Sequence, residues 1–375
     1  MSLANNTIYD QRIKVIINGV EYETSITDGY TTLDSISISG GRSDPTLQPT
    51  PMVASVDIIS NKTTQISFPI NSTFKITTYD ANTGLPSSNA SAYKTLFNGF
   101  ITDVTQAIET VGPTEILYRY TVAATTAMAS LANHRYNYSA GFFVSGDTVN
   151  TVLLYVLGNW DPSSTYTGVI NADSTALYDM GSGILISADL INTAAQSARG
   201  IFQDRPDGLI YYNSYAGTIV TSFAGYDLNM INSPGISISK SITNVYNAIH
   251  VTSPAGSDGT AGDTTSQNSF TYRYGTRDTY LNSLTTRNNQ AADFLALRKN
   301  PKLRPDRITI SLENPNLTDA QRADLFATRT NTGMAFNLPV AMGNTLLTTV
   351  DNWAWSFGHG RALLTLGVSL YSDTH

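Results

Sequence analysis

The sequence contains no cysteine, and this absence removes several classes of protein at once. Disulfide-stapled secreted domains, Fe–S proteins and zinc sites with thiolate ligands all require cysteine. The chain also lacks a run of about 20 apolar residues, the length that crosses a membrane. Residues 1–11 show no basic segment followed by an apolar one. We therefore expect a soluble protein with no membrane span and no recognisable export signal.

Charged residues are scarce. They make up 14% of the chain, against roughly 25% in typical soluble proteins, and Ser, Thr, Asn, Gly and Tyr fill the polar positions. The net charge is −7 and unevenly placed, because residues 1–240 carry 19 acids and 11 bases whereas residues 241–375 carry 10 acids and 11 bases. This composition favours surfaces that contact neighbouring molecules.

One stretch of the last third is locally basic. It comprises Arg287, Arg298, Lys299, Lys302, Arg304 and Arg307, answered by Asp293 and Asp306. A solvated helix end and loop is the ordinary explanation of such a stretch. A contact with phosphate or with an acidic partner is the alternative.

At 375 residues the chain is long enough for two or three domains. Strand patterning dominates its residues 1–125. Ile13, Val15 and Ile17 alternate with other residues, and Asn18-Gly19 then predicts a type I′ hairpin. Similar alternation recurs at 54–58, 74–77 and 116–122. Residues 96–104 are apolar on both faces around Gly99, as expected of a strand that curls or has backbone packed against it.

Helical spacing replaces this pattern over residues 125–200. A short helix is predicted near Ala127 and Leu131, and a second over 149–157 with Asp147 as its N-cap. A third helix is predicted over 188–199, with Ser187 as its cap and Gly200 in the C′ position. These residues indicate a mixed or helical part between two β-rich ones.

The last part returns to strands with interruptions. Pro206-Asp207-Gly208 lies between two apolar runs and predicts a tight turn. Residues 253–269 are rich in Gly, Ser, Thr and Asp without an apolar period, which predicts a mobile loop or surface excursion.

Two further helices and a closing hairpin are predicted after this loop. The first helix covers 289–299 and is stopped by Pro301, and the second, opened by the capping box of Thr318 and Gln321, runs to about residue 328. In the hairpin, Trp353 and Trp355 share one face of a strand, and Gly358-His359-Gly360 forms the turn.

Signatures of catalysis are few. His359 and His375 have no partner at metal-ligand spacing, and His134 and His250 stand alone, where a structural role outweighs that of a ligand or base. The chain has no Gly-x-Ser-x-Gly, no phosphate-binding Gly-x-x-x-x-Gly-Lys and no His-Glu-x-x-His. We expect no catalytic, metal or cofactor site and no enzymatic activity.

Paired carboxylates are the exception to be weighed. Asp204 with Asp207, or Asp173 with Asp179, could flank a glycosidic bond at the ~5–9 Å that such chemistry requires. Turns and helix caps explain carboxylates at these positions equally well. A structural role is therefore favoured for all four.

Three passages, in this order, resemble hub proteins of bacteriophage tails, also called baseplate hub or minor tail proteins. They are Phe97-Asn98-Gly99-Phe100-Ile101-Thr102-Asp103-Val104; the helix at 192–200 followed by residues 201–204 and Asp207-Gly208, with spacing loosened by Arg205-Pro206; and residues 305–310 with the helix at 318–328 and Trp353-Ala354-Trp355. The resemblance is diffuse and covers most of the chain.

The resemblance implies a β-dominated α+β fold with two tube-like antiparallel β-barrel or sandwich domains and mixed helical insertions. The expected parts are a first tube-like domain at 1–125, a mixed or helical domain at 126–202, and a second tube-like domain at 203–375 with a loop and helical insertion at about 253–330. It also implies a homotrimer in the virion, made in the host cytoplasm, that joins the sixfold tail tube or distal tail ring to the tip.

The partners so implied are distal tail or tail tube proteins, tip or fibre proteins, the tape measure protein, and DNA that passes the lumen unread during ejection. An acidic or neutral lining would not hold phosphates, so the basic stretch is expected on an outer or intersubunit surface. The alternatives are a distal tail or tube protein with sixfold stoichiometry, a receptor-binding or carbohydrate-binding β-protein, and a tail-associated glycosidase.

Overall fold

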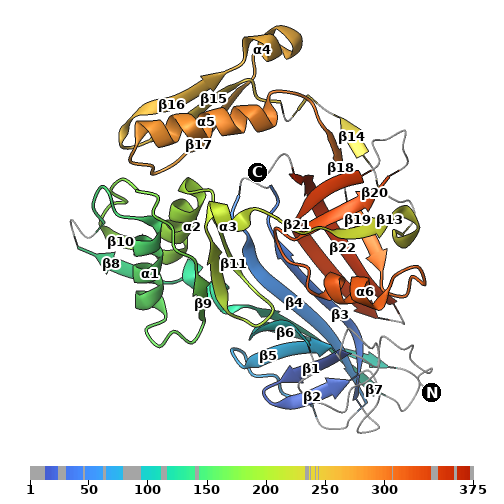
Figure 1. Ribbon diagram of the computed structural model, residues 1–375. Helices are drawn as coiled ribbons and strands as arrows, with labels where there is room; N and C mark the ends of the chain where they lie inside the picture. Colours follow the sequence, from blue (N-terminus) through green and yellow to red (C-terminus); the bar gives the residue numbers. More distant parts are fainter. Residues whose placement is uncertain are drawn as a thin grey trace.

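The computed structural model describes residues 13–23, 31–44, 47–61, 65–78, 94–110, 116–139, 143–232, 236, 238–240, 242–243, 245–305, 307–338, 345–358 and 361–371. A large sheet holds strands from both ends of the chain, and two smaller modules lie beside it (Figure 1). The β-dominated α+β fold that the sequence predicts is confirmed.

Twelve described strands form the large sheet. The first third supplies β1 (Ile13–Ile17), β2 (Val20–Glu23), β3 (Thr31–Gly41), β4 (Thr50–Ser60), β5 (Thr73–Thr78), β6 (Lys94–Thr110) and β7 (Ile116–Thr125). The part of the chain from residue 224 onward supplies β13 (Ala224–Asp227), β19 (Arg307–Ser311), β20 (Gly333–Asn337), β21 (Thr345–Gly358) and β22 (Arg361–Leu370). Their order is β13-β20-β21-β3-β4-β7-β6-β5-β1-β2, and β22 pairs with β21 and β19.

The two β-rich parts of the chain meet inside this sheet. β3 pairs antiparallel with β21, so the blue and red strands of Figure 1 run side by side. One hydrophobic core serves both parts, because Ile38, Val56 and Val122 belong to the same buried cluster as Trp355 and Leu364. That each part is a tube-like domain with the predicted boundaries stays a prediction.

Local signals explain the strands of the first third. Ile13, Val15 and Ile17 are buried, and Asn18 and Gly19 have the positive φ angles of 48° and 80° that the predicted hairpin turn requires. A Cβ on Gly99 would lie 2.2 Å from the carbonyl oxygen of Thr125. The predicted packing of backbone against this glycine is therefore confirmed.

The first smaller module follows β7 in the chain. It contains the 3₁₀ helix η3 (Ala127–Ala132), β8 (Arg135–Tyr138), α1 (Val149–Trp160), β9 (Thr167–Ile170), β10 (Gly183–Ile186), α2 (Ser187–Ser197), β11 (Ile201–Asp204), β12 (Ile210–Asn213) and α3 (Tyr215–Thr218). Val152, Leu153, Ile191 and Ala194 pack α1 and α2 into a core of their own. The predicted mixed, helical character is confirmed.

The predicted cap of α1 is wrong by one residue. Thr148, not Asp147, is the N-cap, because its hydroxyl oxygen accepts the Thr151 N–H at 3.2 Å. Asp147 accepts the Val144 N–H instead. Its carboxylate therefore holds the preceding turn together.

The residues predicted to cap the two ends of α2 are also wrong. The N-cap position is Ile186, which has no capping side chain, and the Ser187 hydroxyl bonds His134 Nδ1 at 2.7 Å. Arg199 holds the left-handed conformation after the helix, with φ of 61°, and Gly200 does not. A Cβ on Gly200 would lie 2.2 Å from the Tyr212 hydroxyl oxygen, so close packing explains this glycine.

The second smaller module contains β15 (Ala248–Ser253), β16 (Gly256–Gly262), α4 (Thr264–Phe270), β17 (Tyr274–Asp278) and α5 (Leu284–Arg298). Its strands have the order β16-β15-β17, and α5 covers one face (Figure 1). A ribbon of β14 (Ile238–Lys240) and β18 (Leu303–Pro305) leads to and from it. The helix predicted at 289–299 begins earlier, after the N-cap Ser283.

The loop predicted at 253–269 is wrong, since these residues include β16 and α4. β16 lacks the apolar alternation by which a strand is predicted. Its position is set instead by backbone pairing with β15 and by contact with α5. A Cβ on Gly259 would lie 2.3 Å from the backbone carbonyl carbon of Arg287, which explains the small residues here. Asp263 caps α4 by accepting the Ser266 N–H at 2.8 Å.

The capping box and the hairpin strand with its two tryptophans are confirmed in the closing part of the chain. The capping box of Thr318 and Gln321 opens α6 (Asp319–Phe326), which ends two residues before the predicted position. Trp353 and Trp355 are buried on one face of β21, and β21 pairs with β22 as a hairpin. The turn residues His359 and Gly360 lie outside the described residues. The short 3₁₀ helix η4 (Leu228–Met230) follows β13.

Candidate functional site

Small side chains, most of them polar, cover the solvent side of the large sheet where its two β-rich parts meet. Alternate residues of β3, β4, β7 and β21 lie there and are partly or fully exposed. We call them the polar face: Ser35, Ser37, Ser39, Ser55, Thr121, Ala123, Ala354 and Ser356. Ser356 lies opposite Ser37, Ser37 opposite Ser55, and Ser55 opposite Ala123. One row of small side chains therefore crosses the junction.

Carboxylates outnumber guanidinium groups beside the polar face. Arg119 Nη1 lies 2.6 Å from an oxygen of Asp34 and 4.0 Å from an oxygen of Asp57. The Asp57 carboxylate also accepts the hydroxyls of Ser35 at 2.9 Å and Thr121 at 2.6 Å. Two carboxylates thus surround one guanidinium, so this region does not concentrate anions.

A buried ion pair fixes the junction of β3 and β21. Arg42 Nε donates to Asp351 Oδ1 at 3.1 Å, and the Arg42 N–H donates to the Asp351 carbonyl at 2.8 Å. Both side chains are about 5% exposed. The Ser369 hydroxyl also donates to the Asp351 carboxylate. Burial raises the pKa of Asp351 and lowers the pKa of Arg42, which opposes the effect of their attraction.

The pair lies where β21 stops pairing with β20 and begins to pair with β3. Residues 345–349 of β21 pair with β20, and residues 352–358 pair with β3. Gly41 precedes Arg42 with φ of 113°, and a Cβ on it would lie 2.3 Å from the Asp351 carbonyl oxygen. Only glycine permits this close approach of the two strands.

Asp204 joins the first smaller module to the large sheet. Its buried carboxylate accepts the Met52 N–H at 3.0 Å and the hydroxyl of Thr126. Burial raises the pKa of Asp204 to about 6, although these hydrogen bonds lower it and Asp207 adds a small rise. This role in structure was missed from the sequence, which offered no signal that Asp204 would face β4.

The other three aspartates considered for glycosidic chemistry also serve local structure. Asp207 accepts the Leu209 N–H and the Tyr211 hydroxyl in the predicted turn. Asp173 accepts the Tyr212 hydroxyl at 2.7 Å and the Thr175 N–H. Asp179 accepts the Gly181 N–H at 2.7 Å. These contacts are those of turns and packing, as the structural interpretation predicts.

The histidines are not brought together. His134 bonds Ser187, whereas His250 on β15 packs against the Tyr274 ring at 4.7 Å and lies 3.8 Å from Asp258. His375, like His359, lies outside the described residues. In the part of the chain that the structure describes, no group of three or more His, Asp or Glu side chains could hold a metal ion. None of its helices is long and apolar enough to span a membrane.

The residues of the basic stretch make separate contacts in different parts of the fold. Arg287 is buried and donates to the carbonyls of Ser257 and Leu281. Lys299 lies 2.9 Å from Asp263. Arg307 is exposed at the start of β19, and Asp306 lies outside the described residues. The described side chains of the stretch therefore form no single cationic patch. A solvated helix end is the wrong explanation for Arg287, because α5 turns this side chain toward β16.

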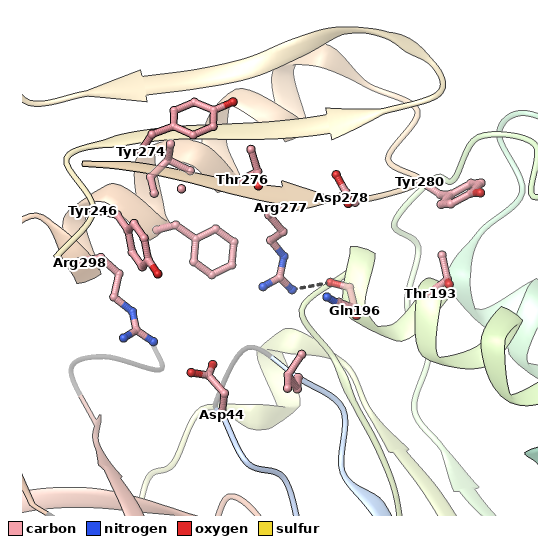
Figure 2. Close-up of a pocket in the computed structure, with 14 residues that line it drawn as sticks. Asp44, Thr193, Gln196, Tyr246, Tyr274, Thr276, Arg277, Asp278, Tyr280 and Arg298 are labelled. Carbon is pink, nitrogen blue, oxygen red and sulfur yellow. Dashed lines mark hydrogen bonds between the residues drawn. The ribbon is translucent and has the colours of Figure 1, made fainter. Parts of the chain in front are cut away.

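A cleft of about 720 Å³ lies between the second smaller module, α2 and the residues after β3. Figure 2 shows Arg277 and Arg298 pointing into it, with Asp44 on the opposite side. Arg277 donates to the Gln196 carbonyl at 2.7 Å and lies 4.4 Å from the centre of the Phe294 ring. The remaining lining is Leu47, Thr193, Tyr246, Ile249, Tyr274, Gly275, Thr276, Asp278 and Tyr280.

Several contacts join two walls of the cleft. Gln290 Nε2 donates to the Ser197 carbonyl at 2.6 Å, and the Tyr280 N–H donates to the Ser197 hydroxyl at 2.9 Å. Arg199 lies 2.7 Å from Asp293 and stacks on Tyr215. The cleft is therefore formed before any ligand arrives.

The sequence matches no known family model and no curated protein. Its fold resembles that of several solved structures, among them two tail proteins and a secretion component. The 43 kDa tail protein of prophage MuSo2 from Shewanella oneidensis gives a TM-score of 0.64 at 9% identity, covering 97% of this chain and 100% of that one. The tail protein from Neisseria meningitidis MC58 gives 0.63 at 12% identity, covering 97% and 98%.

The third is the c3393 protein of E. coli, described as a type VI secretion component with structural similarity to the T4 bacteriophage tail proteins gp27 and gp5. It gives a TM-score of 0.52 at 12% identity, covering 96% of this chain and 78% of that one. The fold of this chain is thus the fold found in phage tail proteins, over nearly its whole length.

Proposed function

We propose that this protein is a structural component of a phage tail tip: a trimeric, non-enzymatic hub that joins the sixfold tail tube or distal tail ring to the tip and encloses the DNA channel. The polar face is the observation that carries the proposal. It extends over strands from both β-rich parts, and its neighbouring guanidinium is balanced by two carboxylates.

Such a face suits a channel through which DNA slides. Affinity for DNA comes mainly from lysine and arginine contacts with phosphates. A surface of serine, threonine and alanine, with Val53 exposed among them and Arg119 paired with carboxylates, offers few such contacts. Three copies of the chain, each with two β-rich parts, would present six β-rich parts to a sixfold partner.

The fold supports the same role. The solved structures that it resembles are tail proteins and a secretion component described as similar to T4 tail proteins. Distal tail or tube proteins, tip or fibre proteins and the tape measure protein are the expected partners, and the virion is the expected location.

Light scattering after gel filtration tests the stoichiometry. The proposal predicts a mass about three times the chain mass of 40.5 kDa, alone or with a distal tail ring. A mass six times that of the chain would instead support the alternative of a distal tail or tube protein. A monomer that does not bind tail proteins would refute both.

A further inference from the structure

The edge strand β17 presents unpaired backbone groups to the cleft. The Ala248 N–H donates to the Arg273 carbonyl, and the Thr279 N–H donates to the Thr252 carbonyl. Because backbone groups alternate along a strand, residues 275 and 277 also turn theirs toward β15. Tyr274, Thr276 and Asp278 therefore direct their N–H and C=O groups outward, and among the described residues these groups have no hydrogen-bond partner.

All five residues of β17 line the cleft. One face of a strand would contribute only alternate residues, so the wall is formed by the strand's free edge (Figure 2). An exposed edge of this kind accepts an additional strand through main-chain hydrogen bonds.

Two guanidinium groups beside this edge retain unused donors. The Nε of Arg277 is buried without a hydrogen-bond partner. Arg298 is buried, and its guanidinium makes no hydrogen bond or ion pair with the described residues, although it points into the same space. Guanidinium donors of this kind pair best with carboxylates.

The aspartates in the lining do not fully balance these cations. Asp278 accepts the Thr252 hydroxyl at 2.6 Å. Burial, followed by the nearby charge of Arg199, lowers the pKa of Arg277 to about 10. The carboxylate of Asp44 acts in the opposite direction and favours the charged form. Arg277 remains protonated at neutral pH in a site where a further carboxylate would stabilise it.

We propose that the cleft binds an extended segment of a partner protein, which adds as a strand to the free edge of β17 and places an acidic side chain against Arg277 and Arg298. The volume of about 720 Å³ is in the range of ligand-binding pockets. Tyr246 and Phe294 supply an apolar surface for the flanking side chains. Binding of this kind goes beyond the hub role and does not depend on trimer formation.

The test uses the full chain and two fluorescein-labelled peptides, TVEVT-amide and its charge-reversed control TVKVT-amide. In fluorescence anisotropy we expect the glutamate peptide to bind about tenfold tighter or more, since hydrogen bonds to charged groups are worth about that much. The amides of Tyr274, Thr276 and Asp278 should exchange hydrogen more slowly when it is bound.

Two matched variants separate backbone pairing from side-chain contact. Thr276→Pro removes an outward N–H without breaking the ladder to β15, so the variant should fold and bind about tenfold more weakly or worse. Thr276→Val keeps the N–H and should bind like the wild type. Arg298→Gln should reduce the preference for the glutamate peptide.

Three outcomes would overturn the proposal. They are equal affinity for both peptides or no binding of either, unchanged affinity in a folded Thr276→Pro variant, and a change of oligomeric mass in that variant. The last would identify a second copy of this chain as the occupant. Because peptide binding and stoichiometry are measured separately, failure here leaves the hub proposal standing.

Discussion

The guanidinium of Arg42 lies 3.1 Å from the carboxylate of Asp351, across 309 positions of sequence. The contact joins the residue that follows β3 to the middle of β21, where β21 stops pairing with β20 and begins to pair with β3. Both groups are buried, so each one's charge is balanced chiefly by the other. We therefore expect this pair to stabilise the junction of β3 and β21.

Removing one member of the pair should be costly. Asp351→Ala leaves Arg42 buried without its carboxylate, which we expect to lower the free energy of unfolding by about 3–5 kcal/mol. Urea unfolding followed by the fluorescence of Trp353 and Trp355 measures this. The double replacement Arg42→Met with Asp351→Leu should recover most of the loss, because neither charge is then left unpaired.

The pair of Lys14 and Glu21, 2.8 Å apart, provides the control, because the Glu21 side chain is 55% exposed. Glu21→Ala should cost about 1 kcal/mol or less, since solvent screens this pair. If Asp351→Ala proves no more costly than Glu21→Ala, the buried pair does not hold the junction.

Gly41→Ala tests the close approach of the two strands. At φ of 113° an alanine is strained, and its Cβ would stand 2.3 Å from the Asp351 carbonyl oxygen. Gly19→Ala is the matched control, with φ of 80° and open space around the Cβ. We expect about 1–2 kcal/mol of strain in the control and a larger loss at Gly41. Equal losses would show that β3 and β21 can separate without cost.

Sequence patterns predicted the elements that local chemistry decides. Alternation placed β1, β7 and β22, the Asn18-Gly19 turn fixed the first hairpin, and the Thr318 capping box fixed the start of α6. β16 escaped prediction because its place comes from its neighbours in the sheet.

Contacts between distant residues left no such signal. Arg42 and Asp351 carry no local pattern that pairs them, and Asp204 resembled a turn residue although its carboxylate bonds Met52. The partner of each group is set by how the strands assemble, which spacing along the chain does not encode.

Stability should depend on pH through Asp204. Its pKa is about 6 in the folded protein and about 3.9 in an unfolded chain, so the folded state binds the proton more tightly. The free energy of unfolding should therefore fall by about 3 kcal/mol as the pH rises from about 4 to 6, then stay level.

Asp204→Asn should abolish this part of the pH dependence, as measured by urea unfolding between pH 4 and 8. The variant Asp207→Asn alters the neighbouring exposed carboxylate and should keep the dependence. Identical pH profiles for the wild type and Asp204→Asn would contradict the assignment.

Lysines on the polar face should give the protein an affinity for DNA that it otherwise lacks. The triple variant Ser37→Lys, Ser55→Lys and Ala123→Lys places three cations in one row of the sheet. Binding of double-stranded DNA should appear and fall steeply with salt, with a slope of about −0.9 per phosphate contact. Matched lysines at the exposed positions Thr264, Thr265 and Ser269 of α4 should have a smaller effect, because no channel would surround the DNA there.

The symmetry of the assembled protein tests the central claim most directly. Electron cryomicroscopy of the purified complex, or of tail tips that contain it, should show a ring of three chains with six β-rich parts around one axis and the polar face turned toward the lumen. A ring of six chains, or a threefold ring with the polar face directed outward, would contradict the account.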